Sequence, residues 1–138
     1  MEMGTKTYPV VLALMVWCAC AEPEIPTNDS LVGKWKLVEI YDGYFHGGSF
    51  TWKKVPANYS GIIEFGIDNQ YFENVDSPDV QRRCTGTYRI LSDTLVELES
   101  SCQTVLVHLK ISELTPTTLI IDHQVIEGVI RNKYSAIK

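Results

Sequence analysis

Hydrophobic and polar positions alternate over most of this chain. From Leu31 onward, short runs rich in β-branched and aromatic residues are separated by turn-forming residues. Apart from a possible helical turn at Thr27–Leu31, no stretch repeats its apolar residues with a helical period. The pattern therefore predicts an all-β fold with about eight strands: Val32–Tyr41, Gly61–Gly66, Gln70–Val75, Cys84–Ile90, Thr94–Ser100, Thr104–Ile111, Thr117–His123 and Val129–Ile137.

The links between these runs indicate how the strands pair. The connections at Asp68-Asn69, Leu91–Asp93 and Leu114–Pro116 are as short as hairpin loops. Parallel neighbours would need long crossovers, so the strands should be antiparallel. About eight such strands favour a single up-and-down antiparallel β-barrel, which removes the sheet edges. A two-sheet β-sandwich is the alternative.

Alternation within the strands assigns side chains to faces. The hairpin around Leu114–Pro116 should place His108 outside the barrel, near Asp122. If Asp68-Asn69 is a two-residue turn, Glu64 lies opposite Glu73, and both are exposed. The inward face of strands 104–111 and 117–123 should carry the apolar residues Val105, Val107, Leu109, Ile111, Leu119 and Ile121.

The N-terminal segment has a different pattern. Tyr8–Trp17 is an apolar run that is too short to span a bilayer. It is followed by Ala19-Cys20, an arrangement similar to bacterial lipoprotein signals, in which the cysteine receives lipid (palmitate). We expect residues 1–19 to be a signal peptide, residues 20–30 a lipidated N-terminus and flexible tether, and residues 31–138 the folded domain.

Alternatives remain for this segment. Cys18 is a second possible acceptor. The segment could also be a plain secretory signal cut near Ala21, or an ordinary buried apolar stretch. Lipidation at Cys20 would give a protein anchored in the bacterial cell envelope, on the periplasmic or surface face of the outer membrane.

Charge and motif content narrow the function. The 138-residue chain has a net charge of −5, which argues against nucleic acid as a partner. Three histidines and four cysteines leave little for a metal site, and His108 and His123 fall on opposite faces. The sequence contains no nucleophile elbow, phosphate loop or dinucleotide fingerprint. We therefore expect no enzyme activity, no cofactor and no metal.

Two cysteines form the clearest pair of chemical groups. Cys84 and Cys102 flank a hairpin that turns near Ser92-Asp93, which sets residue 84 opposite residue 101 or 102. Directly opposed residues have Cα atoms about 4.5–5.5 Å apart, within disulfide range. Export would permit oxidation. The hypothesis is a structural disulfide; two free buried thiols, or a reactive or metal-binding pair, are the alternatives.

The long connection 42–60 is the best candidate for a binding element. Glycines at 43, 47 and 48 give it conformational freedom. Its aromatic residues suit a lid over a ligand pocket or a contact surface, but they could also simply cover one end of a small core. The candidate ligand residues at the barrel mouth are Tyr44, Phe45, Phe50 and Trp52, together with Tyr88 as a large inward-facing side chain.

The order of several short motifs resembles a known family. Gly33-Lys34-Trp35 opens the first strand, Ser60-Gly61 precedes Phe65, and Cys84-x-Gly86-x-Tyr88 is followed by Cys102. This order is similar to small bacterial lipocalin-like lipoproteins. The resemblance implies that Gly33 and Trp35 mark the closed end of an eight-stranded barrel. It also implies that an arginine of the last strand packs over Trp35, with Arg131 the best match and Lys133 the second.

Two functions follow from these expectations. The first is a lipid-anchored envelope protein whose barrel binds a small hydrophobic ligand. The second is a non-catalytic interaction or structural module with a filled barrel. Small barrels can be packed with side chains or can leave room for one ligand, so an internal cavity distinguishes the two functions.

Overall fold

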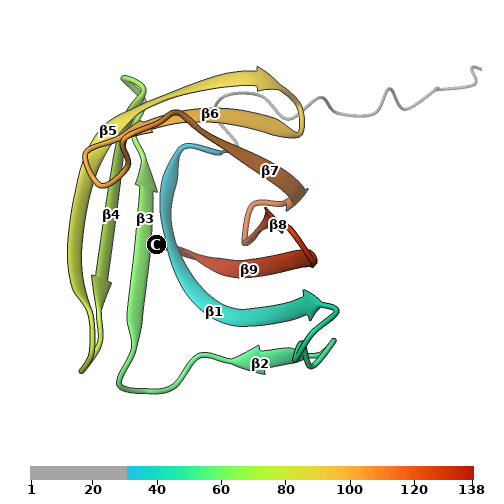
Figure 1. Ribbon diagram of the computed structural model, residues 1–138. Coiled ribbons are helices and arrows are strands. Elements are labelled where there is room, and N and C mark those ends of the chain that lie inside the picture. Colours follow the sequence, from blue (N-terminus) through green and yellow to red (C-terminus); the bar gives the residue numbers. More distant parts are fainter. Residues whose placement is uncertain (1–30) are drawn as a thin grey trace, which may run out of the picture.

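A computed structural model describes residues 31–138 of the chain. Hydrogen bonds join the strands in the order β2-β1-β3-β4-β5-β6-β7-β8-β9, and β1 also pairs with β9. That pairing closes eight antiparallel strands into a barrel, and β2 extends one edge of β1 outside the ring (Figure 1). The barrel prediction is confirmed, and the sandwich alternative is wrong. The strands are β1 (Gly33–Tyr44), β2 (Trp52–Lys54), β3 (Ser60–Phe65), β4 (Gln70–Asp76), β5 (Gln81–Ser92), β6 (Leu95–Ser100), β7 (Val107–Leu114), β8 (Thr118–Val125) and β9 (Gly128–Ile137).

The two ends of the barrel differ. Strand β1 starts next to the end of β3, where Gly33 lies opposite Phe65. The β3–β4, β5–β6 and β7–β8 turns lie at this end, which we call the closed end. The segments 45–59, 77–80, 101–106 and 126–127 lie at the other end, which we call the mouth.

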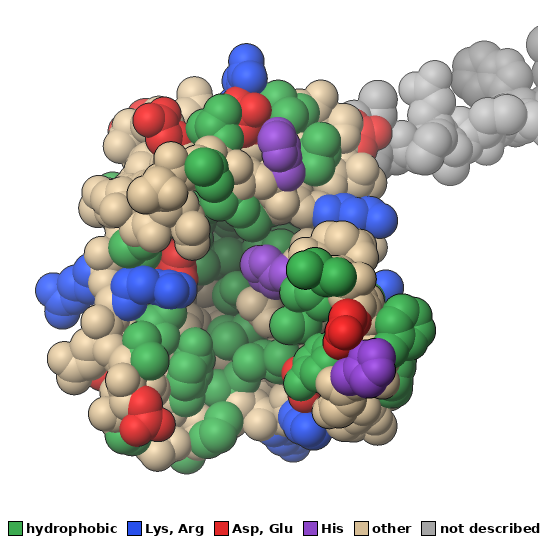
Figure 2. Space-filling view, viewed as in Figure 1, with side chains coloured by type: hydrophobic (Ala, Val, Ile, Leu, Met, Phe, Trp, Pro, Cys, Tyr) green, Lys and Arg blue, Asp and Glu red, His purple; other side chains and the backbone are tan. Residues whose placement is uncertain are grey.

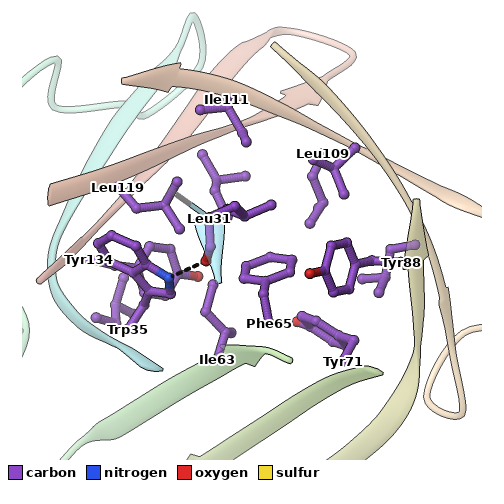
Figure 3. Close-up of a cluster of buried hydrophobic side chains, with 14 residues drawn as sticks. Leu31, Trp35, Ile63, Phe65, Tyr71, Tyr88, Leu109, Ile111, Leu119 and Tyr134 are labelled. Carbon is purple, nitrogen blue, oxygen red and sulfur yellow. Dashed lines mark hydrogen bonds between the residues drawn. The ribbon is translucent and has the colours of Figure 1, made fainter. Parts of the chain in front are cut away.

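The closed half of the barrel is filled by side chains. Trp35 is almost completely buried, and its indole N–H donates a hydrogen bond to the Leu31 carbonyl at 2.9 Å (Figure 3). The Phe65 ring lies 5.4 Å from the Tyr71 ring and 5.0 Å from the Tyr88 ring. The remaining buried residues of this core are Leu37, Ile63, Val96, Leu98, Leu109, Ile111, Leu119, Ile121 and Tyr134.

Gly86 is required by the close approach of β5 and β6. It lies opposite Tyr71 on β4 and Ser100 on β6. A Cβ atom at this position would lie 1.8 Å from the Glu99 carbonyl oxygen, far inside van der Waals contact. The glycine of the Cys-x-Gly-x-Tyr motif therefore has a packing role.

The first strand and its following segment differ from the prediction. β1 continues to Tyr44, because it pairs with β9 as far as Gly128. The short strand β2 lies inside the segment expected to be a loop and pairs with Glu39–Tyr41 of β1. A bulge between Leu37 and Glu39 shifts the alternation of β1 by one residue, so Trp35 and Leu37 face inward before it and Ile40 faces inward after it.

The predicted pairing of His108 with Asp122 is wrong. The hairpin turns at Thr115–Thr118, and a bulge between Ile111 and Glu113 shifts the register. Asp122 therefore lies opposite Lys110, and His108 lies opposite Glu97. Leu119 and Ile121 do join the core with Leu109 and Ile111, whereas Val105 lies before β7 and is exposed.

The predicted pairing of Glu64 with Glu73 is also wrong. Asn69 adopts a left-handed conformation, with φ of 62°, and Gly66 pairs with Gln70 across the turn. The turn is one residue longer than assumed, so Glu73 lies opposite Ile63. Glu73 points into the barrel with Tyr71, while Glu64 points outward and pairs with Lys34 at 3.5 Å.

The predicted signal peptide, Cys20 and the tether lie outside the described residues. Across residues 31–138, no helix has the length and apolar character needed to cross a membrane.

Candidate functional site

An internal cavity of about 200 Å³ occupies the mouth half of the barrel. Figure 2 shows a hollow in the face of the molecule, and hydrophobic side chains lie on the floor of this hollow. Apolar side chains from four strands form the deeper wall, and polar side chains form a band nearer the mouth. The apolar residues are Ile63, Leu98, Val107, Leu109 and Ile121; the polar residues are Tyr71, Glu73, Arg82, Ser100, Gln103, His123, Asn132 and Tyr134.

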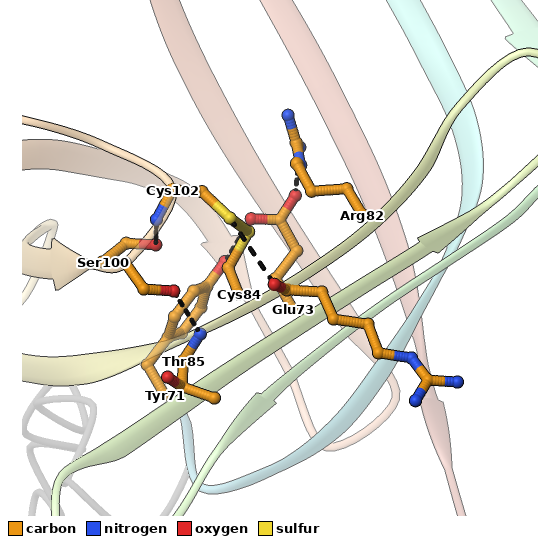
Figure 4. Close-up of a disulfide and its surroundings, with 9 residues drawn as sticks. Tyr71, Glu73, Arg82, Cys84, Thr85, Ser100 and Cys102 are labelled. Carbon is orange, nitrogen blue, oxygen red and sulfur yellow. Dashed lines mark hydrogen bonds and ion pairs between the residues drawn. A yellow bond between two sulfur atoms is a disulfide. The ribbon is translucent and has the colours of Figure 1, made fainter.

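One side of the polar band is an ion pair. Arg82 on β5 binds the Glu73 carboxylate on β4, and the Tyr71 hydroxyl donates to the same carboxylate at 3.4 Å (Figure 4). Burial, together with the negative charge of Glu73, raises the pKa of Tyr71 well above its ordinary value, so this tyrosine stays neutral. The pair presents a carboxylate and a guanidinium whose charges compensate each other.

The opposite side of the band is a neutral network. The Asn132 amide nitrogen lies 3.2 Å from His123 Nε2 and 3.4 Å from the Tyr134 hydroxyl oxygen. Burial lowers the pKa of His123, although Asp122 and Glu73 favour its charged form. Burial raises the pKa of Tyr134 to about 12. At neutral pH this side offers hydrogen-bonding groups without charge.

The disulfide fixes the polar band to the mouth. Cys84 and Cys102 are bonded at 2.04 Å with Cα atoms 5.5 Å apart, which confirms the predicted pairing (Figure 4). Cys84 lies directly opposite Glu73 in the β4–β5 register. Cys102 belongs to the segment 101–106, whose Gln103 lines the cavity. The bond therefore ties a mouth segment to the strand that faces Glu73.

Comparison with known proteins assigns the family. Residues 31–121, more than half of the chain, match the lipocalin-like domain family. The chain belongs to the lipocalin-like domain family. A lipocalin-like protein from Bacteroides uniformis has a similar crystal structure, with a TM-score of 0.57 and 15% sequence identity over 78% of this chain and 99% of the other. No curated protein matches this sequence.

The mouth aromatics predicted to bind ligand are dispersed in the lipocalin-like barrel. Tyr44 lines an open groove at the mouth, next to Ile130. Phe45 and Phe50 are exposed on the segment after β1. Trp52 packs outside the barrel, with its ring 5.5 Å from the Tyr41 ring, so it does not line the cavity as predicted.

Tyr88 is also wrongly assigned to the mouth. Its ring packs edge-on against Phe65 in the closed half, and its hydroxyl donates to the Gly66 carbonyl at 2.8 Å. Tyr88 therefore helps to fill the closed half of the core.

The expected arginine cover over Trp35 is also wrong. Arg131 lies opposite Tyr41, well along β1 from Trp35, which lies opposite Ala136. Its guanidinium is 5.6 Å from the Tyr41 ring centre and binds the buried Asp122 carboxylate at 3.1 Å. Lys133 lies over the Trp52 ring and binds Glu39, so neither cation covers Trp35. Gly33 and Trp35 themselves lie at the closed end.

The sequence reasoning missed the polar band of the cavity. The sequence predicts an exposed Glu73, although this residue alternates with the inward residues Tyr71 and Val75 on β4. His123 follows the same alternation after Leu119 and Ile121, and Asn132 after Tyr134. The sequence signal for the polar band was the presence of polar residues at inward positions, otherwise apolar, near one end of several strands. In residues 31–138, no three metal-binding side chains form a cluster.

Proposed function

We propose that this lipocalin-like barrel binds a small hydrophobic ligand in the cavity of its mouth half. The supporting observation is the combination of an apolar wall and a polar band around about 200 Å³ of internal space. Ligand sites commonly pair apolar walls with a few polar groups that orient the ligand. The closed half is packed with side chains around Trp35 and Phe65, whereas the mouth half encloses the cavity.

Filling the cavity tests this function. Val107 lines the cavity, whereas the next residue, His108, points outward and is exposed. We expect Val107→Trp to weaken binding of the apolar fluorophore N-phenyl-1-naphthylamine by at least tenfold, and His108→Trp to leave it unchanged. Fluorescence titration measures both. If the fluorophore binds neither the parent nor the variants, and native mass spectrometry finds no retained apolar molecule, ligand binding is refuted.

We further propose that the barrel is exported and held in the bacterial cell envelope by lipid on Cys20. The order of apolar run, small residue and cysteine supports this. The disulfide is consistent with an oxidising compartment. Labelling with an alkyne analogue of palmitate in a bacterial host tests the anchor: Cys20→Ala should abolish incorporation, while Cys18→Ala should retain it.

The second candidate function is a non-catalytic interaction module of the envelope. It is favoured by exposed apolar side chains at the mouth, notably Phe45, Val105 and Ile126. These side chains would form a contact surface for a protein partner. The Val107→Trp variant separates the two functions, because filling the cavity leaves an external contact surface unchanged.

A further inference from the structure

The inner face of the barrel continues past the cavity. The outer parts of β1, β8 and β9 extend beyond the other strands, and we call residues 40–44, 123–125 and 128–132 the flap. A second, open groove of about 580 Å³ lies on this flap. Its lining is mainly apolar and comprises Tyr44, Gln124, Val125, Ile126, Glu127 and Ile130.

Strand register places the groove and the cavity on one inward stripe. On β9 the inward positions run from Tyr134 through Asn132 to Ile130, and on β8 they run from Ile121 through His123 to Val125. The first two residues of each series line the cavity, and the last residues, Ile130 and Val125, line the groove. The polar pair His123 and Asn132 therefore lies between two apolar regions.

Charged residues beside this stripe have partners, and Glu127 of the groove lies 3.2 Å from His46 Nδ1. Glu73 is paired with Arg82. Asp42 lies opposite the inward Ile130 and pairs with Lys53 at 3.3 Å. His123 is uncharged at neutral pH because burial lowers its pKa. A ligand with a net charge would find no uncompensated counter-charge here and would lose its hydration, whereas a neutral hydrogen-bonding group would meet donors and acceptors without that cost.

We infer that the site takes an elongated, uncharged amphiphile, with one apolar arm in the cavity, a central hydrogen-bonding group at His123 and Asn132, and a second apolar arm along the flap. This inference rests on the proposed ligand-binding function and adds the ligand class. The arms match the two apolar regions, and the central group matches the polar band that separates them.

Three matched probes test the ligand class. N-hexyloctanamide has two apolar arms around an amide, octanamide has one arm, and octanoate replaces the amide by a charged group. By isothermal titration calorimetry at neutral pH, we expect N-hexyloctanamide to bind at least tenfold more tightly than octanamide. We expect octanoate to bind several-fold more weakly than octanamide, because the band contains no uncompensated cation.

Two neighbouring residues on β9 provide matched variants. Ile130 lines the groove, and Val129 points to the outside of the sheet. Ile130→Ser should remove most of the advantage of the second arm and leave octanamide binding unchanged, while Val129→Ser should change neither. Asn132→Leu should weaken both amides several-fold. Circular dichroism melting of each variant establishes that it is folded before binding is compared.

The outcomes separate this inference from the proposed function. If N-phenyl-1-naphthylamine and all three probes fail to bind, the ligand-binding function fails, and the inference fails with it. If the fluorophore or octanamide binds but the second arm adds nothing, the two-armed ligand is refuted while ligand binding stands. Octanoate binding more tightly than octanamide would likewise refute the uncharged ligand alone.

Discussion

At the scale of single residues, Trp35 connects the closed end to the chain that precedes the barrel. Its ring is buried in the core, and its N–H donates to the Leu31 carbonyl. We expect Trp35→Phe to lower the free energy of unfolding by about 2–3 kcal/mol, since it leaves a buried carbonyl unpaired and opens a small cavity. Urea denaturation followed by circular dichroism measures this loss.

Trp52 provides the matched control for Trp35. Its side chain lies outside the barrel against Tyr41, where it remains 38% exposed. Trp52→Phe should cost less than about 1 kcal/mol, because the substitution leaves no buried group unpaired. Equal losses in the two variants would contradict the role assigned to the Trp35 hydrogen bond.

At the scale of elements, the disulfide fastens the 101–106 segment to β5. It closes a loop with a sequence separation of 18, for which the chain-entropy account gives about 3 kcal/mol. We expect the double variant Cys84→Ala/Cys102→Ala to be destabilised by about this amount in urea denaturation. Reducing the parent protein should reproduce the loss, and an unchanged midpoint after full reduction would contradict it.

Elements also show what the sequence could predict. The strands and their antiparallel order followed from alternation and short connections, because most inward positions had to be apolar to close a core. The register of each strand pair, by contrast, could not be predicted from alternation and connection length. One additional turn residue moved Glu73 from opposite Glu64 to opposite Ile63, and the hairpin turn at Thr115–Thr118, together with a bulge in β7, placed Asp122 opposite Lys110 and not His108. Hydrogen bonding of turns and bulges decides such single-residue shifts, and residue types alone specify it weakly.

The candidate site was harder to predict than the fold for the same reason. The disulfide was predictable because both cysteines flank one short hairpin. The polar band combines Glu73 and Arg82 with His123 and Asn132, which lie on strands far apart in the sequence. Only closure of the barrel brings these pairs together, so local patterns could not show that they share a cavity.

At the scale of the whole molecule, stability should fall on mild acidification. Burial lowers the pKa of His123 below its ordinary value of 6.5 in the folded state. Above that value both folded and unfolded states hold a neutral imidazole. As the pH falls below it, the unfolded state takes up the proton first, so the free energy of unfolding decreases.

A matched pair of histidine variants isolates this effect. We expect His123→Gln to lose less stability than the parent between pH 7.5 and pH 5. His108→Gln should behave as the parent does, because His108 is exposed on the outside of the barrel. Urea denaturation midpoints at the two pH values give the comparison. An identical acid sensitivity of His123→Gln and the parent would rule out this residue as the source.

The position of the closed end also determines how an anchored barrel would face its membrane. Leu31 packs into the closed end, eleven residues after the proposed anchor Cys20. A flexible chain of that length has a mean reach of about 18 Å. The twelve-residue strand β5 spans about 30 Å along a barrel axis at the usual strand tilt. The anchor should therefore hold the closed end toward the membrane and leave the mouth facing away from it.

Single cysteines on opposite ends test this orientation. Ile67 lies in the β3–β4 turn at the closed end, and Ile126 lies at the mouth; both side chains are exposed. Ile67→Cys and Ile126→Cys, each labelled with the same fluorophore in the lipidated protein on vesicles, should be quenched differently by spin-labelled lipid headgroups. We expect stronger quenching at position 67, and no quenching at either position when Cys20→Ala removes the anchor. Stronger quenching at position 126 would show that the mouth faces the membrane, so that ligands would enter from the bilayer to which the barrel is tethered.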